Sequence, residues 1–301
     1  MSSRSFGYNV STRSMWQKVR AKDSPFAWKT DLPLRRLIRQ AYMSSGMIEE
    51  TGLWVERGGN GAPTLVLLHG LGANAAVWAG LRPVVEAKWP ARWMMLDLPG
   101  HGRSCQRPPY GYAAYAAAVA GLLGQDEEVV LLGHSMGGVV AMVLATGWFG
   151  IRVRQVLAFG VKLDWMDEEV AKLREIGRAP VRWFKTREEA QERYLRVSGL
   201  KDLVDPDSAC AARGIIESEG KFRLSVDPAA NLAVGPPVDS IIRAMNAPLR
   251  LAAGERDPAV SAEQMRRYDP HAVLLEGLGH NPHVESPDRL WQLMESLPIT
   301  P

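Results

Sequence analysis

From about residue 47, short apolar runs alternate with stretches in which apolar positions repeat at helical spacing. Such runs are typical of strands in a parallel sheet that helices cover on both faces. The predicted strands are a two-stranded start at Met47–Thr51 and Leu53–Arg57, followed by Thr64–Leu68, Trp93–Leu96, Val129–Leu132, Val153–Phe159, Pro248–Ala253 and Ala272–Glu276. Helices are predicted over 75–85, Tyr112–Leu123, Gly138–Leu144 and Pro287–Leu297. The alternation predicts an α/β fold with a mostly parallel, doubly wound sheet, whose core comprises residues 47–161 and 246–301.

The alternation stops between residues 162 and 245, where the sequence looks mostly helical. Helices are predicted over Trp165–Ile176, Thr186–Val197 and Ser208–Ser218. Thr186 and Glu189 have the spacing of a capping box at the start of the second. We find no strand-length apolar run with a sheet-like flank in this segment. It is therefore predicted to be a helical lid, inserted between the two halves of the core.

The first 46 residues form a separate, basic segment in this interpretation. Residues 1–45 hold nine Lys and Arg against two Asp, a net charge of +7, whereas the whole chain carries +3, so the remainder carries −4. A helix is predicted from Asp31, which can cap it, to Gly46, which ends it. We expect an N-terminal helical extension that docks on the core. Contact with an acidic partner or an anionic membrane surface through residues 1–45 is the alternative.

Composition indicates a globular protein and gives no sign of nucleic-acid binding, a metal or disulfide framework, or a membrane-spanning segment. The 301 residues, 46% of them hydrophobic, can bury a large core, and the mild net charge gives no indication of nucleic-acid binding. The two cysteines, Cys105 and Cys210, show neither metal-ligand spacing nor a disulfide framework. No apolar run reaches the roughly 20 residues that span a bilayer, and the N-terminus lacks the apolar core of a secretory signal. We predict a cytoplasmic protein of unassigned oligomeric state.

The most informative motif is Gly-His-Ser-Met-Gly, residues 133–137, between a predicted strand and a predicted helix. A serine at such a strand–turn–helix corner has a strained backbone that needs small neighbours. The corner exposes the Ser135 hydroxyl and directs the first N–H groups of the helix at the space above it, where they stabilise negative charge. A glycine-rich turn can also be purely structural, so the remaining motifs decide the interpretation.

Three further motifs accompany the serine corner: His-Gly-x-Gly at 69–72, Asp-x-Pro-Gly-x-Gly-x-Ser at 97–104 and Gly-His-x-x-His-x-Glu-x-Pro at 279–287. With these motifs in this order, the sequence from about Met47 to Ile299 resembles the α/β-hydrolase family. It is most similar to the branch with a serine nucleophile and a helical lid, which includes esterases, lipases and thioesterases. The resemblance implies an α/β-hydrolase fold and requires no metal or organic cofactor.

The family's catalytic residues follow the order serine, acid, histidine. A serine hydroxyl needs a base in contact with it, and the base needs an orienting anion. The resemblance implies that Ser135 is the nucleophile and His280, the first histidine of the terminal motif, is the base. The second histidine, His283, is expected to begin the final helix and to pack.

The acid is expected in Gly-Glu-Arg-Asp-Pro, residues 254–258, directly after a predicted strand. Asp257 matches the family position, Glu255 is the nearest alternative, and Asp164 is a more distant one. In the family, backbone N–H groups of the two turns form the oxyanion hole, which here implies Leu71 and Met136.

Substrate-binding residues are expected mainly in the lid. It carries a group of aromatic and apolar side chains, and one body residue joins them: Trp165, Met166, Trp183, Phe184 and Trp78. Together they would form an apolar pocket for an acyl or alkyl group of moderate size. Each could instead pack the lid on the body.

The sequence therefore predicts a serine hydrolase that cleaves a carboxylic ester of a small to medium, largely apolar substrate through an acyl-enzyme. Thioesterase, lactonase and carbon–carbon hydrolase activity on the same triad are alternatives. His134 before the serine disfavours the last, because that branch tends to have Asn there. A serine nucleophile argues against epoxide hydrolase or dehalogenase chemistry. A small-molecule receptor or partner-binding scaffold with little turnover is the alternative outside the enzymes.

Overall fold

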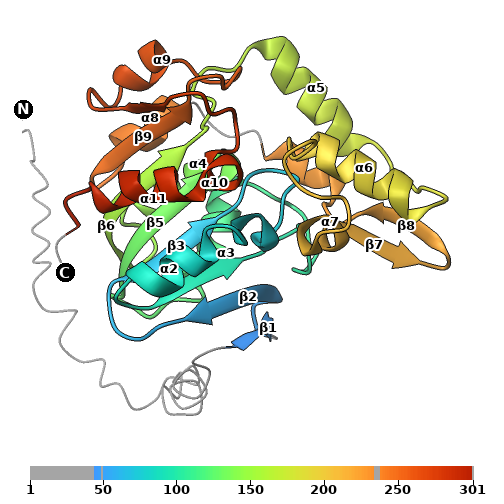
Figure 1. Cartoon of the computed structure of the whole chain (residues 1–301), viewed down its shortest axis with the longest axis horizontal. Helices are drawn as coiled ribbons and strands as arrows, with labels where there is room; N and C mark the ends of the chain where they lie inside the picture. The colour runs from blue at the N-terminus through green and yellow to red at the C-terminus, as the bar shows by residue number, and fades with distance from the viewer. Residues whose placement is uncertain (1–43, 49, 234–237, 300–301) are drawn as a thin grey trace, which may run out of the picture. The chain divides into compact units, whose positions relative to one another are not determined.

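The computed structural model describes residues 44–48, 50–233 and 238–299, and a central eight-stranded sheet organises them (Figure 1). The strand order is β1-β2-β4-β3-β5-β6-β9-β10. All pairs from β4 to β10 are parallel, whereas β1–β2 and β2–β4 are antiparallel. The strands are β1 Ser44–Ile48, β2 Leu53–Gly58, β3 Thr64–Leu68, β4 Trp93–Leu96, β5 Glu128–His134, β6 Arg152–Phe159, β9 Leu249–Gly254 and β10 Val273–Leu275. The prediction of a mostly parallel α/β sheet is confirmed.

Helices cover both faces of this sheet, and each face has its own apolar core. Val66 and Leu68 of β3 belong to one buried cluster together with α3 and α4, whereas Leu65 and Leu67 belong to the other. Neighbouring side chains of a strand point to opposite faces, so a fully apolar strand is needed where both faces are buried. The core helices are η1 Ala75–Trp78, α2 Arg82–Lys88, α3 Tyr112–Ala120, α4 Met136–Leu144, α9 Ala262–Arg266, α10 Pro282–Glu285 and α11 Pro287–Glu295.

Most of the segment predicted as a lid gathers at the right of Figure 1, whereas its last helix lies at the upper left, beside β9. Its helices are α5 Asp167–Arg178, α6 Arg187–Val197, α7 Ala209–Arg213, η2 Pro228–Leu232 and α8 Val238–Arg243. The last of these packs against α4 in the core. A two-stranded antiparallel sheet, β7 Ile215–Ser218 and β8 Lys221–Leu224, interrupts the helices. The prediction of a helix through Ser218 without a strand is therefore wrong.

The hairpin was missed because of its turn. Glu219 and Gly220 both have positive φ, 50° and 70°, which is the backbone of a tight two-residue hairpin turn. Gly is usual in such a turn, but Asn or Asp usually precedes it, and Glu at the first position hides the signal. The capping box at 186–189 also forms only in part. The Thr186 hydroxyl accepts the Glu189 N–H, but the Glu189 carboxylate accepts the N–H of Lys185 instead of Thr186.

The predicted N-terminal helix from Asp31 lies outside the described residues as far as residue 43. β1 begins at Ser44, and Gly46 pairs with Val55 inside the sheet. The helix therefore does not extend to Gly46, and the segment boundary drawn after residue 46 falls within a strand. In the described part of the chain, no helix is long and apolar enough to cross a membrane.

The turn after β4 holds together the loops that follow β3 and β4. Asp97 is fully buried, and its carboxylate accepts the N–H groups of Ala75 at 2.6 Å and Arg103 at 2.9 Å. Gly102 has a φ of 53°, and a Cβ there would collide with the Asp97 carboxylate. The Asp-x-Pro-Gly-x-Gly-x-Ser motif is thus architectural.

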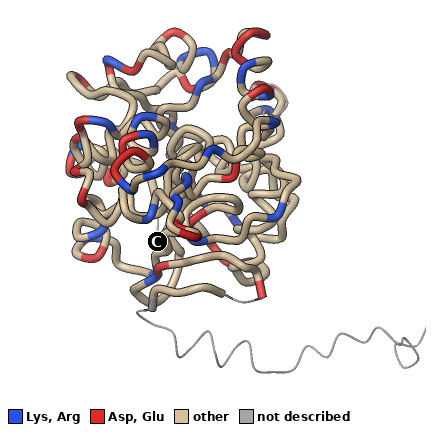
Figure 2. Tube along the Cα trace, turned by 90° about the vertical axis from the view of Figure 1, so that its right-hand side faces the viewer, with Lys and Arg blue, Asp and Glu red and all other residues tan. Residues whose placement is uncertain are grey.

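Basic and acidic positions are interspersed over the described chain (Figure 2). Many of them form ion pairs, such as Arg152 and Arg154 near the start of β6 with Glu128 at the start of β5. Such exposed pairs contribute little to stability. Arginines in the described residues that have no acidic partner are therefore candidates for binding an anionic ligand.

Candidate active site

Ser135 occupies the sharp turn between β5 and α4. Its φ is 50° and its ψ −116°, a conformation that costs a non-glycine residue about 1–3 kcal/mol. The Ser135 N–H donates to the carbonyl of Phe159 at 2.8 Å, which ties the turn to β6. A Cβ at Gly133 would lie 2.5 Å from the Gly137 carbonyl oxygen, and one at Gly137 would collide with the backbone of β3. The small residues around the serine are therefore imposed by close backbone packing.

Asp257 and His280 form the pair that the sequence predicted. The His280 Nδ1 donates to an Asp257 carboxylate oxygen at 2.8 Å, so the tautomer with a free Nε2 is favoured. The Asp257 side chain is fully buried, while that of His280 is 30% exposed. The other Asp257 oxygen accepts the N–H of Ala259 at 2.9 Å. A buried, oriented carboxylate behind a partly exposed imidazole is the arrangement that a general base requires.

The two alternative acids are engaged elsewhere. Glu255 accepts the N–H of Gly277 at 2.9 Å. Asp164 pairs with Arg267 and accepts from Gln264. In this structure, the carboxylate at the imidazole is that of Asp257.

Ser135 and His280 line the same cavity, which has a volume of about 210 Å³. Among the described residues, no hydrogen bond joins the Ser135 hydroxyl to the His280 ring. Catalytic hydrogen bonds are often long without substrate and shorten only in the reacting complex. The structure thus brings the three predicted catalytic residues to one site.

The predicted oxyanion donors border this site as well. Leu71 lines the cavity that contains Ser135 and His280, and Met136 lines an adjoining cavity of about 60 Å³ that also contains Ser135. Met136 is the first residue of α4, so its N–H has no carbonyl partner within the helix. His69 holds the Leu71 turn: its Nδ1 donates to the Gly70 carbonyl at 2.8 Å, and its Nε2 accepts the N–H of Leu98 at 2.9 Å. Burial lowers the pKa of His69 and so favours the neutral ring that both bonds require.

The loop that carries His280 is fixed on both sides by one carboxylate. Glu285 accepts the N–H of Gly279 at 2.7 Å and that of Asn281 at 3.0 Å. His134 supports the same loop, since its Nε2 donates to the His280 carbonyl at 2.9 Å. Sequence reasoning included Glu285 in the terminal motif but gave it no role. The position of Glu285, five residues after His280 in that motif, could have indicated this role.

Two further histidines are buried beneath His280. The rings of His134 and His280 are 4.8 Å apart, and those of His134 and His283 are 4.6 Å apart. Burial lowers the pKa of His283 to about 3 and that of His134 well below its usual value. Both rings are therefore neutral at pH 7. His283 packs in the core at the start of the last helical segment, as predicted.

The predicted substrate-binding residues fall into three groups. Trp165 lines the small cavity beside Ser135, and Phe184 lines a larger one of about 560 Å³. Trp78 is fully buried and packs on His283 at 4.7 Å, so its assignment to the substrate pocket is wrong. Trp78 supports the histidines from beneath instead. Met166 and Trp183 are exposed in the segment predicted as a lid and border none of these cavities, so their role stays a prediction.

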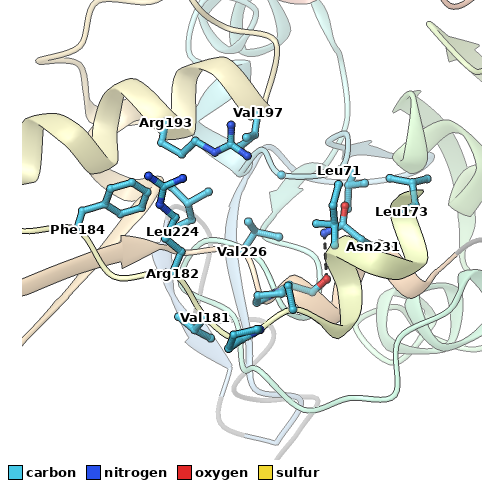
Figure 3. A pocket seen from close by; sticks show the side chains of 15 residues that line it. Leu71, Leu173, Val181, Arg182, Phe184, Arg193, Val197, Leu224, Val226 and Asn231 are labelled. Carbon is cyan, nitrogen blue, oxygen red and sulfur yellow. Dashed lines mark hydrogen bonds between the residues drawn. The ribbon is translucent and has the colours of Figure 1, made fainter. Parts of the chain in front are cut away.

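The largest of these cavities extends from Leu71 between elements of the segment predicted as a lid, as Figure 3 shows. Its walls are mainly apolar and come from the turn after β3, from α5 and α6 with the segment between them, and from β8 and η2 with the segment between them. Within the described residues, no group of three or more His, Cys, Asp or Glu side chains is arranged to hold a metal ion.

Comparison with known proteins agrees with this geometry. The sequence model of the alpha/beta hydrolase family matches residues 65–293, which is most of the chain. The protein therefore belongs to the alpha/beta hydrolase family.

Within that family, the chain is similar to the pimeloyl-[acyl-carrier protein] methyl ester esterase of Aeromonas hydrophila. The two are 45% identical over 93 residues, which is 30% of this chain and 35% of the relative. The chain thus matches only about a quarter to a third of the length of the first curated relatives. Among solved structures, the thioesterase domain from the curacin biosynthetic pathway superposes with a TM-score of 0.68 at 20% identity, over 85% of this chain and 99% of that one.

The E-2-(acetamidomethylene)succinate hydrolase superposes with the same TM-score of 0.68, at 20% identity over 84% of this chain and 98% of that chain. At such identities, both structures show the shared fold alone.

Proposed function

We propose that the protein is a serine esterase in which Ser135, Asp257 and His280 form the catalytic triad. The observation that carries this proposal is the buried Asp257 carboxylate bound to His280, with His280 and the strained Ser135 in one cavity. The curated relatives named as methyl ester esterases support the same reaction.

The reaction would proceed through an acyl-enzyme. His280 Nε2 takes the Ser135 proton as the hydroxyl oxygen attacks the ester carbonyl. Asp257 stabilises the resulting imidazolium, and the N–H groups of Leu71 and Met136 hold the oxyanion, each worth about 3 kcal/mol. The imidazolium then protonates the leaving alcohol. Water, deprotonated by His280, splits the acyl-enzyme, releases the acid and restores Ser135.

The substrate is proposed to be of small to medium size, with an apolar acyl chain. The cavity of about 560 Å³ adjoins the Ser135 site through Leu71 and is lined mainly by aliphatic side chains. Residues 162–245 act as the lid that supplies most of those walls. We also propose a cytoplasmic location, supported by two unpaired thiols, Cys105 and Cys210.

The test is hydrolysis of p-nitrophenyl esters of increasing acyl length by the wild type and by Ser135→Ala. The proposal predicts an optimum at intermediate length, and loss of activity in the variant by at least about a thousandfold. Equal activity of both proteins would refute the serine mechanism. Hydrolysis of thioesters but not of oxygen esters would replace the esterase with a thioesterase on the same triad.

A further inference from the structure

We propose that the acyl cavity ends in a cationic site, so that the preferred substrate carries an anionic group at the end of its acyl chain remote from the ester. This inference rests on the proposed function for the position of the reacting bond. It adds a substrate class that the triad alone does not define.

The first step is the continuity of the cavity with the catalytic serine. Leu71 borders the large cavity and both cavities that contain Ser135. Leu173 and Asn231 are shared with one of these, and Val197 with the other. An acyl chain bound to Ser135 can therefore extend past Leu71 into the larger space.

The second step is the chemistry of the far end. Figure 3 shows Arg182 beside Phe184 and Arg193 next to Val197, both on the side of the cavity away from Leu71 and Leu173. Val226 lies between these two ends, and Val181 and Leu224 add aliphatic surface near Arg182. The cavity thus has one catalytic end, an apolar middle and a cationic end.

The third step is the lack of internal partners for these two arginines. Of the other arginines on α6, Arg187 pairs with Glu217, and Arg196 pairs with Glu192. Among the described residues, Arg182 and Arg193 form neither an ion pair nor a side-chain hydrogen bond; Arg182 lies over the Phe184 ring at 4.9 Å.

Two carboxylates lie nearby. Glu189 and Glu192 line a neighbouring cavity of about 290 Å³ together with Arg182, Arg193 and Arg196. Glu189 accepts the Lys185 N–H, and Glu192 pairs with Arg196. This leaves two arginines that face the acyl cavity with free donors.

Guanidinium groups recognise carboxylates and phosphates through paired N–H donors. A carboxylate-ended acyl ester, such as the monoester of a dicarboxylic acid, has the required chemistry. So does an acyl chain that is attached to a larger carrier through a phosphate. The shared element is an anion beyond an apolar chain.

The test measures binding rather than turnover, so that it is independent of the esterase proposal. Binding of monomethyl suberate to Ser135→Ala is compared by calorimetry with that of methyl octanoate, its neutral counterpart of equal chain length. We expect the carboxylate-ended ligand to bind about tenfold more tightly, because two partly exposed charge pairs together give an effect of that size. Addition of Arg182→Gln and Arg193→Gln should reduce the affinity ratio to about one. Arg187→Gln, on the same helix but paired with Glu217, should leave the ratio unchanged.

Equal binding of the two ligands, or a ratio that survives both arginine substitutions, would overturn the inference. A methyl ester of an equally long acid that ends in a phosphate distinguishes the two sources of the anion. Tighter binding of the phosphate indicates a carrier, and tighter binding of the carboxylate indicates a free diacid monoester. If the ratio follows the arginines but the wild type hydrolyses no ester, then the esterase proposal fails while the anion site stands.

Discussion

Glu285→Gln tests whether the loop that carries His280 must be held from both sides. The carboxylate accepts two backbone N–H groups, from Gly279 and Asn281, at 2.7 and 3.0 Å. Glutamine keeps the shape and one acceptor oxygen, but it places an NH₂ group against the second N–H. The variant therefore loses one charge-assisted hydrogen bond and weakens the other.

Hydrogen bonds to charged groups contribute about 1.5–3 kcal/mol each. The substitution therefore removes roughly 2–4 kcal/mol of the hydrogen-bond energy that holds the His280 loop in place. His280 keeps its bonds to Asp257 and, through its carbonyl, to His134. We therefore expect only part of this energy to appear in the reaction, as a fall in kcat of about 10–100-fold with little change in KM.

The assay is steady-state hydrolysis of the best p-nitrophenyl ester, together with urea unfolding. Glu255→Gln is the matched control, because Glu255 accepts the N–H of Gly277, earlier in the same loop, but does not bind Gly279 or Asn281, the residues that flank His280. Its kcat should stay within twofold of the wild type. If Glu285→Gln lowers stability but leaves kcat unchanged, then the carboxylate does not position His280 and the reasoning is refuted.

Three further changes have definite expected outcomes. His101 and His283 have a pKa of about 3 in the folded protein but of about 6.5 in the unfolded chain. The free energy of unfolding should therefore fall as the pH drops below about 6.5, by about 2 kcal/mol per histidine at pH 5. An equal urea midpoint at pH 7.5 and pH 5 would contradict this. Asp257→Asn should lower kcat by about 10³–10⁴-fold without loss of fold, since the imidazole tautomer is lost; a change below tenfold would point to another acid. Gly137→Ala should lower the free energy of unfolding by more than about 3 kcal/mol, because its Cβ would collide with the backbone of β3. In the control variant Gly111→Ala the new Cβ meets open space, so its stability should stay close to that of the wild type. Equal melting temperatures of the two variants would refute the packing argument.

Much of this architecture was predictable because local sequence and global fold agree. In a run such as Thr64–Leu68, the four consecutive apolar residues after Thr64 indicate a strand covered on both faces, and all five positions are buried. The small residues at 133 and 137 indicated a tight corner, and the structure shows the backbone contacts that demand them. The Asp257–His280 pair was predicted because both residues match positions in the motifs of the family that the sequence resembles, although only the fold brings the residues together.

Other features depend on tertiary packing that no local pattern encodes. Trp78 was predicted to line the substrate pocket, but it is buried against His283 instead. The β7–β8 hairpin was concealed by Glu219 at a turn position where another residue is usual. The grouping of Arg182 with Arg193 arises because α6 and the segment before it face one cavity. The sequence alone gives no indication that Arg182 and Arg193 line the same cavity.

The most direct test of the central claim is the reaction of the full chain with a fluorophosphonate, followed by intact mass and peptide mapping. This reagent forms a covalent bond with a serine only where a base and an oxyanion hole activate it. The account predicts one adduct per chain, located at Ser135, absent in Ser135→Ala and formed at least about a hundredfold more slowly in His280→Gln. An unmodified Ser135, or a labelling rate that does not depend on His280, would contradict it.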